Sequence, residues 1–238
     1  MTEPAPVRVL PAAIERWDDV ALLLDGDYGD KGCWCQAWRG RDAVARATGE
    51  SRPQTLRRQL ETDTPPPGFI AYLDDEPVGW CGVSVRTRTP RLLNSRTIPL
   101  LDDLPVWSIG CFRIRVGFRR RGVATALLSA VVEAARAAGA PAVEAYPIDP
   151  AGQRVDVGFA FVGIASMFDR AGFRRVMPTN ARSAGHQRLL MRLELSQPNP
   201  GQPDPASSIS AVSAQPSGEA SPGHRSSRQP TATSHPGD

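Results

Sequence analysis

Five arginines lie between residues 113 and 121 with no carboxylate among them, directly before a stretch with helical spacing. The alternation of Phe112, Ile114 and Val116 predicts a strand, and the apolar spacing from Val123 onward predicts a helix. A helix N-terminus has unpaired N–H groups and a partial positive charge, so it attracts phosphate. These residues predict a site for an anionic, phosphorylated ligand between the strand and the helix.

The spacing Arg119-x-x-Gly122-x-Ala124 resembles the Arg/Gln-x-x-Gly-x-Gly/Ala signature of the GNAT superfamily of acyl-CoA-dependent N-acyltransferases. The resemblance implies acetyl-CoA as co-substrate, with its pyrophosphate on the backbone of this turn and its pantetheine arm along the preceding strand. The cofactor-binding residues so implied are Ile114, Val116, Arg119, Arg120, Arg121, Gly122, Val123, Ala124 and Thr125. The alternative is a strand–turn–helix with a solvated basic turn.

The resemblance also implies an oxyanion donor and a general base. A backbone N–H near Phe112 would polarise the thioester carbonyl, because negative charge develops on that oxygen in the transition state. Residues 105–116 contain no Asp or Glu, so the base must come from elsewhere. Glu144 is the first choice, and it shares one face of a predicted strand with Tyr146. One alternative is that Glu144 has a structural role. Another is that Asp102 or Asp103 is the base.

The general acid is where this sequence departs from the family. Family members often carry Tyr four residues before the Gly of a Gly-Phe pair, and that tyrosine can protonate the leaving thiolate. Here the position is Phe168, before Gly172 and Phe173. Ser166, Tyr146 or water could substitute.

The four cysteines are the remaining reactive side chains. Cys33-x-Cys35 could suggest zinc, but a structural zinc site normally takes four ligands, so we expect no metal. Cys111 lies in a predicted strand, where cysteine is usually a small core residue rather than a nucleophile. Trp34 and Trp38 are four residues apart, so a helix here would place both on one face, where they could wall a substrate cleft.

The surrounding pattern predicts one α/β domain. We expect strands at 7–10, 69–73, 78–85, 105–116, 141–146, 173–176 and 188–195, and helices at 13–25, 53–63, 123–138 and 162–171. A hairpin meander joined to a βαβ unit gives a mixed, mostly antiparallel sheet flanked by helices, which is similar to the GNAT fold.

Composition sets the domain limits. Residues 197–238 contain 8 Pro, 4 Gly and 9 Ser in 42 positions and no aromatic residue, so we expect a disordered tail after a domain spanning 1–196. No signal peptide and no run of 18 apolar residues is evident, so we expect a cytoplasmic protein without membrane contact. No recognisable nucleic-acid-binding motif accompanies the basic turn.

The combined expectation is an N-acetyltransferase that moves an acetyl group from acetyl-CoA to a primary amine by direct attack in a ternary complex. A non-catalytic acyl-CoA-binding module is the first alternative, and an unrelated phosphate-binding protein is the second. The acceptor could be a small amine or a protein or peptide. Exposed strand edges would also permit a homodimer.

Overall fold

The fold is described from a computed structural model of the chain, in residues 6–25, 32–153, 161–183 and 185–195. The expected tail, 197–238, lies outside these residues, and so do residues 154–160 between the expected strand at 141–146 and the expected helix at 162–171. Within them no helix is long and apolar enough to cross a membrane.

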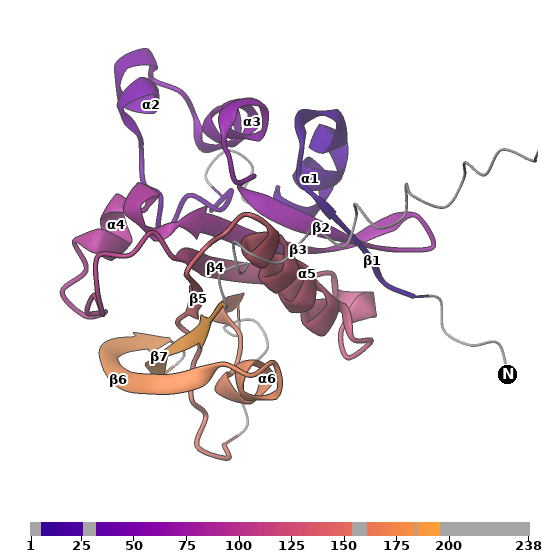
Figure 1. The fold of residues 1–238 in the computed structure, drawn as a ribbon. Helices are drawn as coiled ribbons and strands as arrows, with labels where there is room; N and C mark the ends of the chain where they lie inside the picture. Colours follow the sequence, from indigo (N-terminus) through magenta and orange to yellow (C-terminus); the bar gives the residue numbers. More distant parts are fainter. Residues whose placement is uncertain (1–5, 26–31, 154–160, 184, 196–238) are drawn as a thin grey trace, which may run out of the picture. The chain divides into compact units, whose positions relative to one another are not determined.

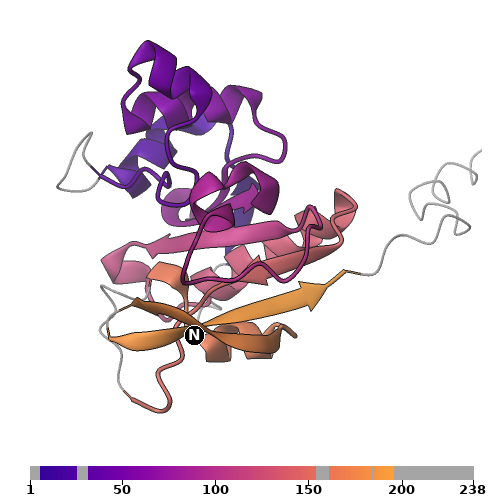
Figure 2. The same cartoon turned by 90° about the vertical axis from the view of Figure 1, so that its left-hand side faces the viewer.

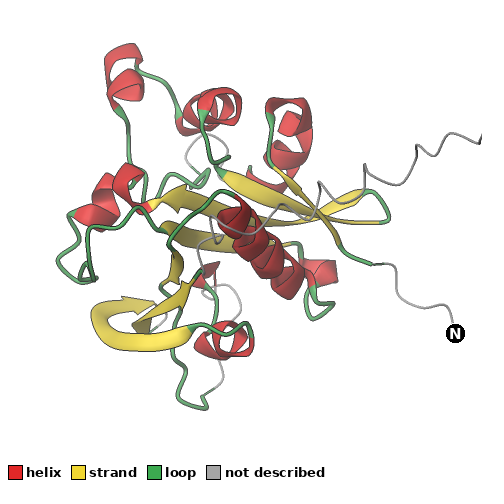
Figure 3. Ribbon diagram, viewed as in Figure 1, coloured by secondary structure: helices red, strands yellow, loops and turns green. Residues whose placement is uncertain are grey.

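Seven strands form one sheet in the order β1-β2-β3-β4-β5-β7-β6 (Figures 1 and 3). Neighbouring strands are antiparallel except β4 and β5, which are parallel. The mixed, mostly antiparallel sheet predicted from the sequence is confirmed. The strands are β1 (Arg8–Pro11), β2 (Gly68–Leu73), β3 (Glu76–Val85), β4 (Trp107–Ile114), β5 (Ala142–Ala145), β6 (Arg174–Ser183) and β7 (His186–Glu194).

Helices cover both faces of the sheet, and the alternation of side chains along a strand shows how. In β2, Phe69 and Ala71 join the core under α5, whereas Ile70 and Tyr72 join a second core under α1 and α3. Figure 2 shows the helices of the N-terminal part together on one side of the sheet. The helices are η1 (Ile14–Arg16), α1 (Trp17–Leu24), α2 (Ala43–Thr48), α3 (Arg52–Thr62), η3 (Arg86–Arg88), α4 (Pro90–Leu93), η4 (Val116–Phe118), α5 (Val123–Ala137) and α6 (Ala165–Arg170).

The sheet has a short seam between β4 and β5. Only three residue pairs join them, from Trp107 opposite Val143 to Ile109 opposite Ala145. Beyond Ile109, β4 continues to Ile114 beside β3 alone. The five residues at this end of β4 therefore keep one edge without a strand partner in the described part of the chain.

Several sequence predictions need correction. Residues 33–38 form turns rather than a helix, with Trp34 and Cys35 in the left-handed region at φ of 44° and 57°. No helix was predicted between the strands at 78–85 and 105–116, where η3 and α4 lie, and α2 was not predicted either. Val116 lies in η4 rather than in the central strand, because the chain turns there toward α5.

Candidate active site

The turn before α5 opens onto a large cavity of about 1280 Å³. Gly122 is the N-cap of α5 and takes a φ of 77°, a left-handed conformation that glycine adopts without steric cost. A Cβ at this position would have no atom within 4 Å, so the backbone there is open to a ligand. The start of a 15-residue helix thus faces an open cavity with its unpaired N–H groups.

The predicted cofactor residues line this cavity with one exception, and Phe112 lines it with them. The exception is Arg121, whose guanidinium stacks on the Phe118 ring at 5.4 Å from its centroid. Arg113 donates to the Leu24 carbonyl at 3.3 Å, and Arg115 pairs with Glu76. The arginines that line the cavity from the basic turn itself are Arg119 and Arg120.

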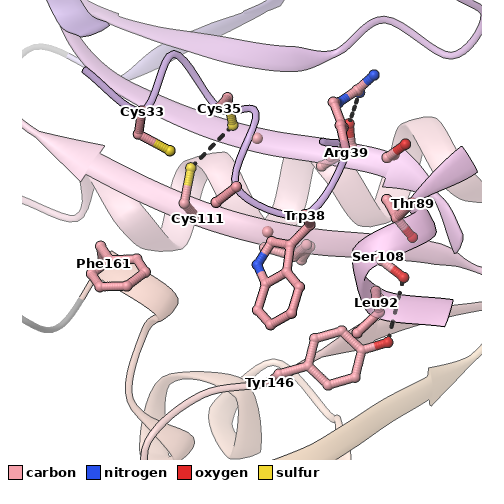
Figure 4. Close-up of a pocket in the computed structure, with 16 residues that line it drawn as sticks. Cys33, Cys35, Trp38, Arg39, Thr89, Leu92, Ser108, Cys111, Tyr146 and Phe161 are labelled. Atoms are coloured by element: carbon pink, nitrogen blue, oxygen red, sulfur yellow. Dashed lines mark hydrogen bonds between the residues drawn. The ribbon is translucent and has the colours of Figure 1, made fainter. Parts of the chain in front are cut away.

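A second, small cavity of about 50 Å³ lies beside the first (Figure 4). Trp38 and Tyr146 form part of its wall, with ring centroids 6.3 Å apart. Trp34 points elsewhere and stacks on Trp17 in the core under α1, so the two tryptophans do not share a face. Trp38 is therefore the tryptophan that walls the small cavity.

The two cavities meet at five residues that line both. Three of these are the cysteines Cys33, Cys35 and Cys111, and the others are Ala37 and Phe161. No carboxylate is among the described residues that line the small cavity. A group passing from one cavity to the other therefore passes thiols rather than carboxylates.

Glu144, the first choice for a general base, is fully buried in β5 and lines neither cavity. Its carboxylate accepts from Arg86 at 2.9 Å and from Arg192 at 3.1 Å, and the Tyr146 hydroxyl donates to it at 2.7 Å. Asp102 completes the cluster by accepting from both arginines. These contacts occupy Glu144 within a buried network and favour the structural alternative.

The Tyr146 hydroxyl is held by the same network. Burial, and then the nearby charge of Glu144, raise the pKa of Tyr146 well above its ordinary 10.0. The phenol therefore stays protonated, and its O–H donates a hydrogen bond to the Glu144 carboxylate. Ser108 lies 3.5 Å from the same hydroxyl.

Phe168 stands where the family often has tyrosine, and it belongs to the core. It is fully buried and meets Phe112 and Phe173 edge to face, with centroids 6.1 and 5.2 Å apart. Such aromatic pairs add stability beyond their buried area. Phe168 lines neither cavity.

The cysteines are arranged in a way that the sequence did not suggest. Cys35 Sγ and Cys111 Sγ are 3.2 Å apart, and the Trp80 indole N–H donates to Cys35 at 3.3 Å. Cys81 points into the core under α5. Across the described ranges, no cluster of three or more Cys, His, Asp or Glu residues is placed to hold a metal ion.

A model of the acetyltransferase (GNAT) family matches residues 16–155. The chain belongs to the GNAT family. The match spans α1 to β5 and includes the turn at Gly122 and most of the residues that line the large cavity. Membership identifies the protein as an acyltransferase by family.

The solved structures that resemble this GNAT protein have low sequence identity to it. A Corynebacterium glutamicum structure described as histone acetyltransferase HPA2 and related acetyltransferase is 19% identical, covers 83% of this chain and 99% of its own, and has a TM-score of 0.46. Ard1 from Thermoplasma volcanium is 15% identical, with 80% and 99% covered and a TM-score of 0.44. A chain of the NatC complex bound to Gag peptide and CoA is 12% identical, with 80% and 99% covered and a TM-score of 0.46. No curated protein matches the sequence.

Proposed function

We propose that this protein transfers an acetyl group from acetyl-CoA to a primary amine by direct attack in a ternary complex. The observation that carries the proposal is the open N-terminus of α5 at Gly122, which faces a cavity that continues along the edge of β4 that has no strand partner among the described residues. The N–H groups of the helix start would hold the pyrophosphate, and Arg119 and Arg120 would add charge. The thioester would then lie near Phe112, whose N–H is the proposed oxyanion donor.

The acceptor amine would enter through the small cavity. Its walls are largely apolar, with Trp38 and Tyr146 on one side and Leu92 behind them (Figure 4). Arg39 also lines it, but its guanidinium is paired with Asp63 at 2.8 Å. Such a wall suits an amine attached to an apolar or aromatic group, of a small molecule or of a peptide, better than a polycation.

A non-catalytic acyl-CoA-binding module remains the second candidate. The buried Phe168 favours it, because this side chain has no proton to give and does not reach the cavity. The two candidates share cofactor binding and differ in turnover. Release of free CoA across a panel of amines separates them, since binding without release for any amine supports the module.

Acetyl-CoA binding is tested by calorimetry on the variant Gly122→Trp. The indole would fill the space of the pyrophosphate, and losing two hydrogen bonds to a charged group at about 1.5 kcal/mol each weakens binding on the order of 100-fold. Gly139→Trp is the matched control, because Gly139 follows the other end of α5 with a φ of 67° and equally open surroundings. Equal affinity in the two folded variants would contradict the site.

A further inference from the structure

The Cys35–Cys111 pair is held in place by three separate elements. The two sulfur atoms are 3.2 Å apart, one on the turn after residue 32 and the other on β4. The Trp80 indole on β3 donates to Cys35 from a third direction. Gly82 leaves room for this arrangement, because a Cβ there would stand 2.0 Å from Cys35 Sγ. The pair is therefore a built feature rather than a chance approach of two thiols.

The pair also lies where the reaction would take place. Cys35 and Cys111 line both cavities, and Cys111 directly precedes Phe112 (Figure 4). The donor thioester would reach this junction from the large cavity and the amine from the small one. The large cavity has one carboxylate among its described lining residues, Asp25, which is exposed at the end of α1.

The two thiols differ in how readily they ionise. The hydrogen bond from Cys111 is the largest of the effects that bring the pKa of Cys35 down to about 7. Burial raises this pKa, whereas the Trp80 N–H and the charge of Arg39 lower it further. The same hydrogen bond, with burial, raises the pKa of Cys111 well above 9.0. Above about pH 7 the pair therefore holds one proton, with Cys35 as thiolate and Cys111 as thiol.

Two neighbouring groups that share one proton and have well-separated pKa values are suited to act as base and acid in one reaction. Among the described residues, the other titratable or charged groups that interact with the charge of Cys35 are Cys33 and Arg39 on its own segment and, from the opposite face of β3, Cys81. None of these is a carboxylate that would compete for the proton. A base whose pKa lies near the working pH is the most effective one.

Resting on the acetyl transfer proposed above, we propose that the Cys35–Cys111 pair carries its proton transfers, with Cys35 as base and Cys111 as acid. The acceptor binds as the free amine, having left one proton to solvent, and its nitrogen lone pair forms the C–N bond to the thioester carbon. The nitrogen then loses a second proton to the Cys35 thiolate.

The remaining steps return the pair to its starting state. The C–S bond breaks with its electron pair on the CoA sulfur, which takes the proton of Cys111. The new proton on Cys35 then crosses the 3.2 Å to the Cys111 thiolate. The assignment supplies a base, which β4 cannot provide because it carries no carboxylate, and an acid, which Phe168 cannot be.

The first test measures ionisation without any acceptor. Alkylation of Cys35 by iodoacetamide, followed by peptide mass spectrometry from pH 5 to 10, should reach half its maximal rate near pH 7. Cys111→Ala should move that midpoint toward 9.0, whereas Cys81→Ala, which removes a thiol from the opposite face, should leave it in place. A wild-type midpoint at 9.0, or no shift in Cys111→Ala, overturns the proposal.

The second test measures turnover with the best amine of the panel. Cys35→Ser should lower kcat/KM by about 10²–10⁴-fold, the usual contribution of a general base, with acetyl-CoA affinity unchanged by calorimetry. The acidic limb of the wild-type pH profile near pH 7 should vanish in this variant, which a merely structural cysteine would not cause.

The outcomes separate the two proposals. If the wild-type protein turns over no amine, the proposed acetyl transfer fails and this inference fails with it. If the wild type is active and Cys35→Ser equals it, or if Asp25→Asn alone abolishes activity, only the present inference fails. An acetyl group found covalently on Cys35 in acid-quenched protein overturns this inference and the direct attack proposed above, in favour of an acyl-enzyme, while leaving acetyl transfer itself in place.

Discussion

Replacing Glu144 by Gln should cost stability rather than chemistry. The substitution keeps the size of the side chain but removes the charge that faces Arg86 and Arg192, whose side chains are each 2% exposed. Breaking a buried ion pair by removing one partner costs about 3–5 kcal/mol. Asp102 still contacts both arginines, so we expect the lower end, ~3 kcal/mol. For a domain of this size that corresponds to a fall in Tm of about 6–12 °C.

Thermal and urea unfolding, followed by circular dichroism, measure this loss, and calorimetry with acetyl-CoA measures binding in the folded variant. Glu133→Gln is the matched control, because Glu133 pairs with Arg136 on the surface of α5 with its side chain 72% exposed. An exposed pair contributes about 0–1 kcal/mol, so this variant should unfold close to the wild type.

The opposite pattern would refute the reasoning. If Glu144 is the general base, Glu144→Gln should retain its Tm and lose about 10²-fold or more in kcat/KM. That result would return the base to β5 and would require the carboxylate to reach substrate from a position that lines neither cavity.

Two further predictions concern neighbouring side chains. Burial opposes ionisation of Asp102, but hydrogen bonds from Arg86 and Arg192 outweigh burial and hold the pKa of Asp102 below its ordinary 3.8. The resulting stabilisation of the folded protein is fully present above pH 3.8. It is lost as the pH falls through the lower pKa that Asp102 has in the folded protein. The gap in unfolding free energy between wild type and Asp102→Asn should therefore narrow in acid titrations below pH 4, and a gap independent of pH would contradict this. Phe168→Tyr should lower stability by about 1–3 kcal/mol without raising kcat, because its hydroxyl enters an apolar cluster without a partner; a gain in turnover would show that the hydroxyl reaches the leaving sulfur.

The sheet and the long helix were predictable because their apolar periodicity is local. The strand–turn–helix around Gly122 follows from residues within about one helical turn of one another, and so does the shared face of Glu144 and Tyr146. The departure at Phe168 was also visible, since it rests on one residue at one spacing.

The site beyond the turn depends on contacts between distant residues, which periodicity does not record. Arg86 and Arg192 reach Glu144 from 58 and 48 positions away, so its burial in an ion network could not be read from β5 alone. Cys35 and Cys111 are 76 positions apart. The shared helical face considered for Trp34 and Trp38 does not form, because the chain takes positive φ at Trp34 and Cys35, and the Cys35 sulfur contacts β4 and β3. This tertiary arrangement overrides the local spacing.

The short seam between β4 and β5 has a consequence for how the protein can vary. Three residue pairs join the two parts of the sheet, and Glu144 sits at the middle pair with its charged partners around it. Apolar contacts would hold the two parts together at many angles, whereas hydrogen-bonded ion pairs are directional and permit few. The angle between the two parts, and with it the opening beside the end of β4 that has no strand partner in the described chain, is then restricted by Arg86, Asp102, Glu144 and Arg192. Residues that line this opening can change without removing that restriction.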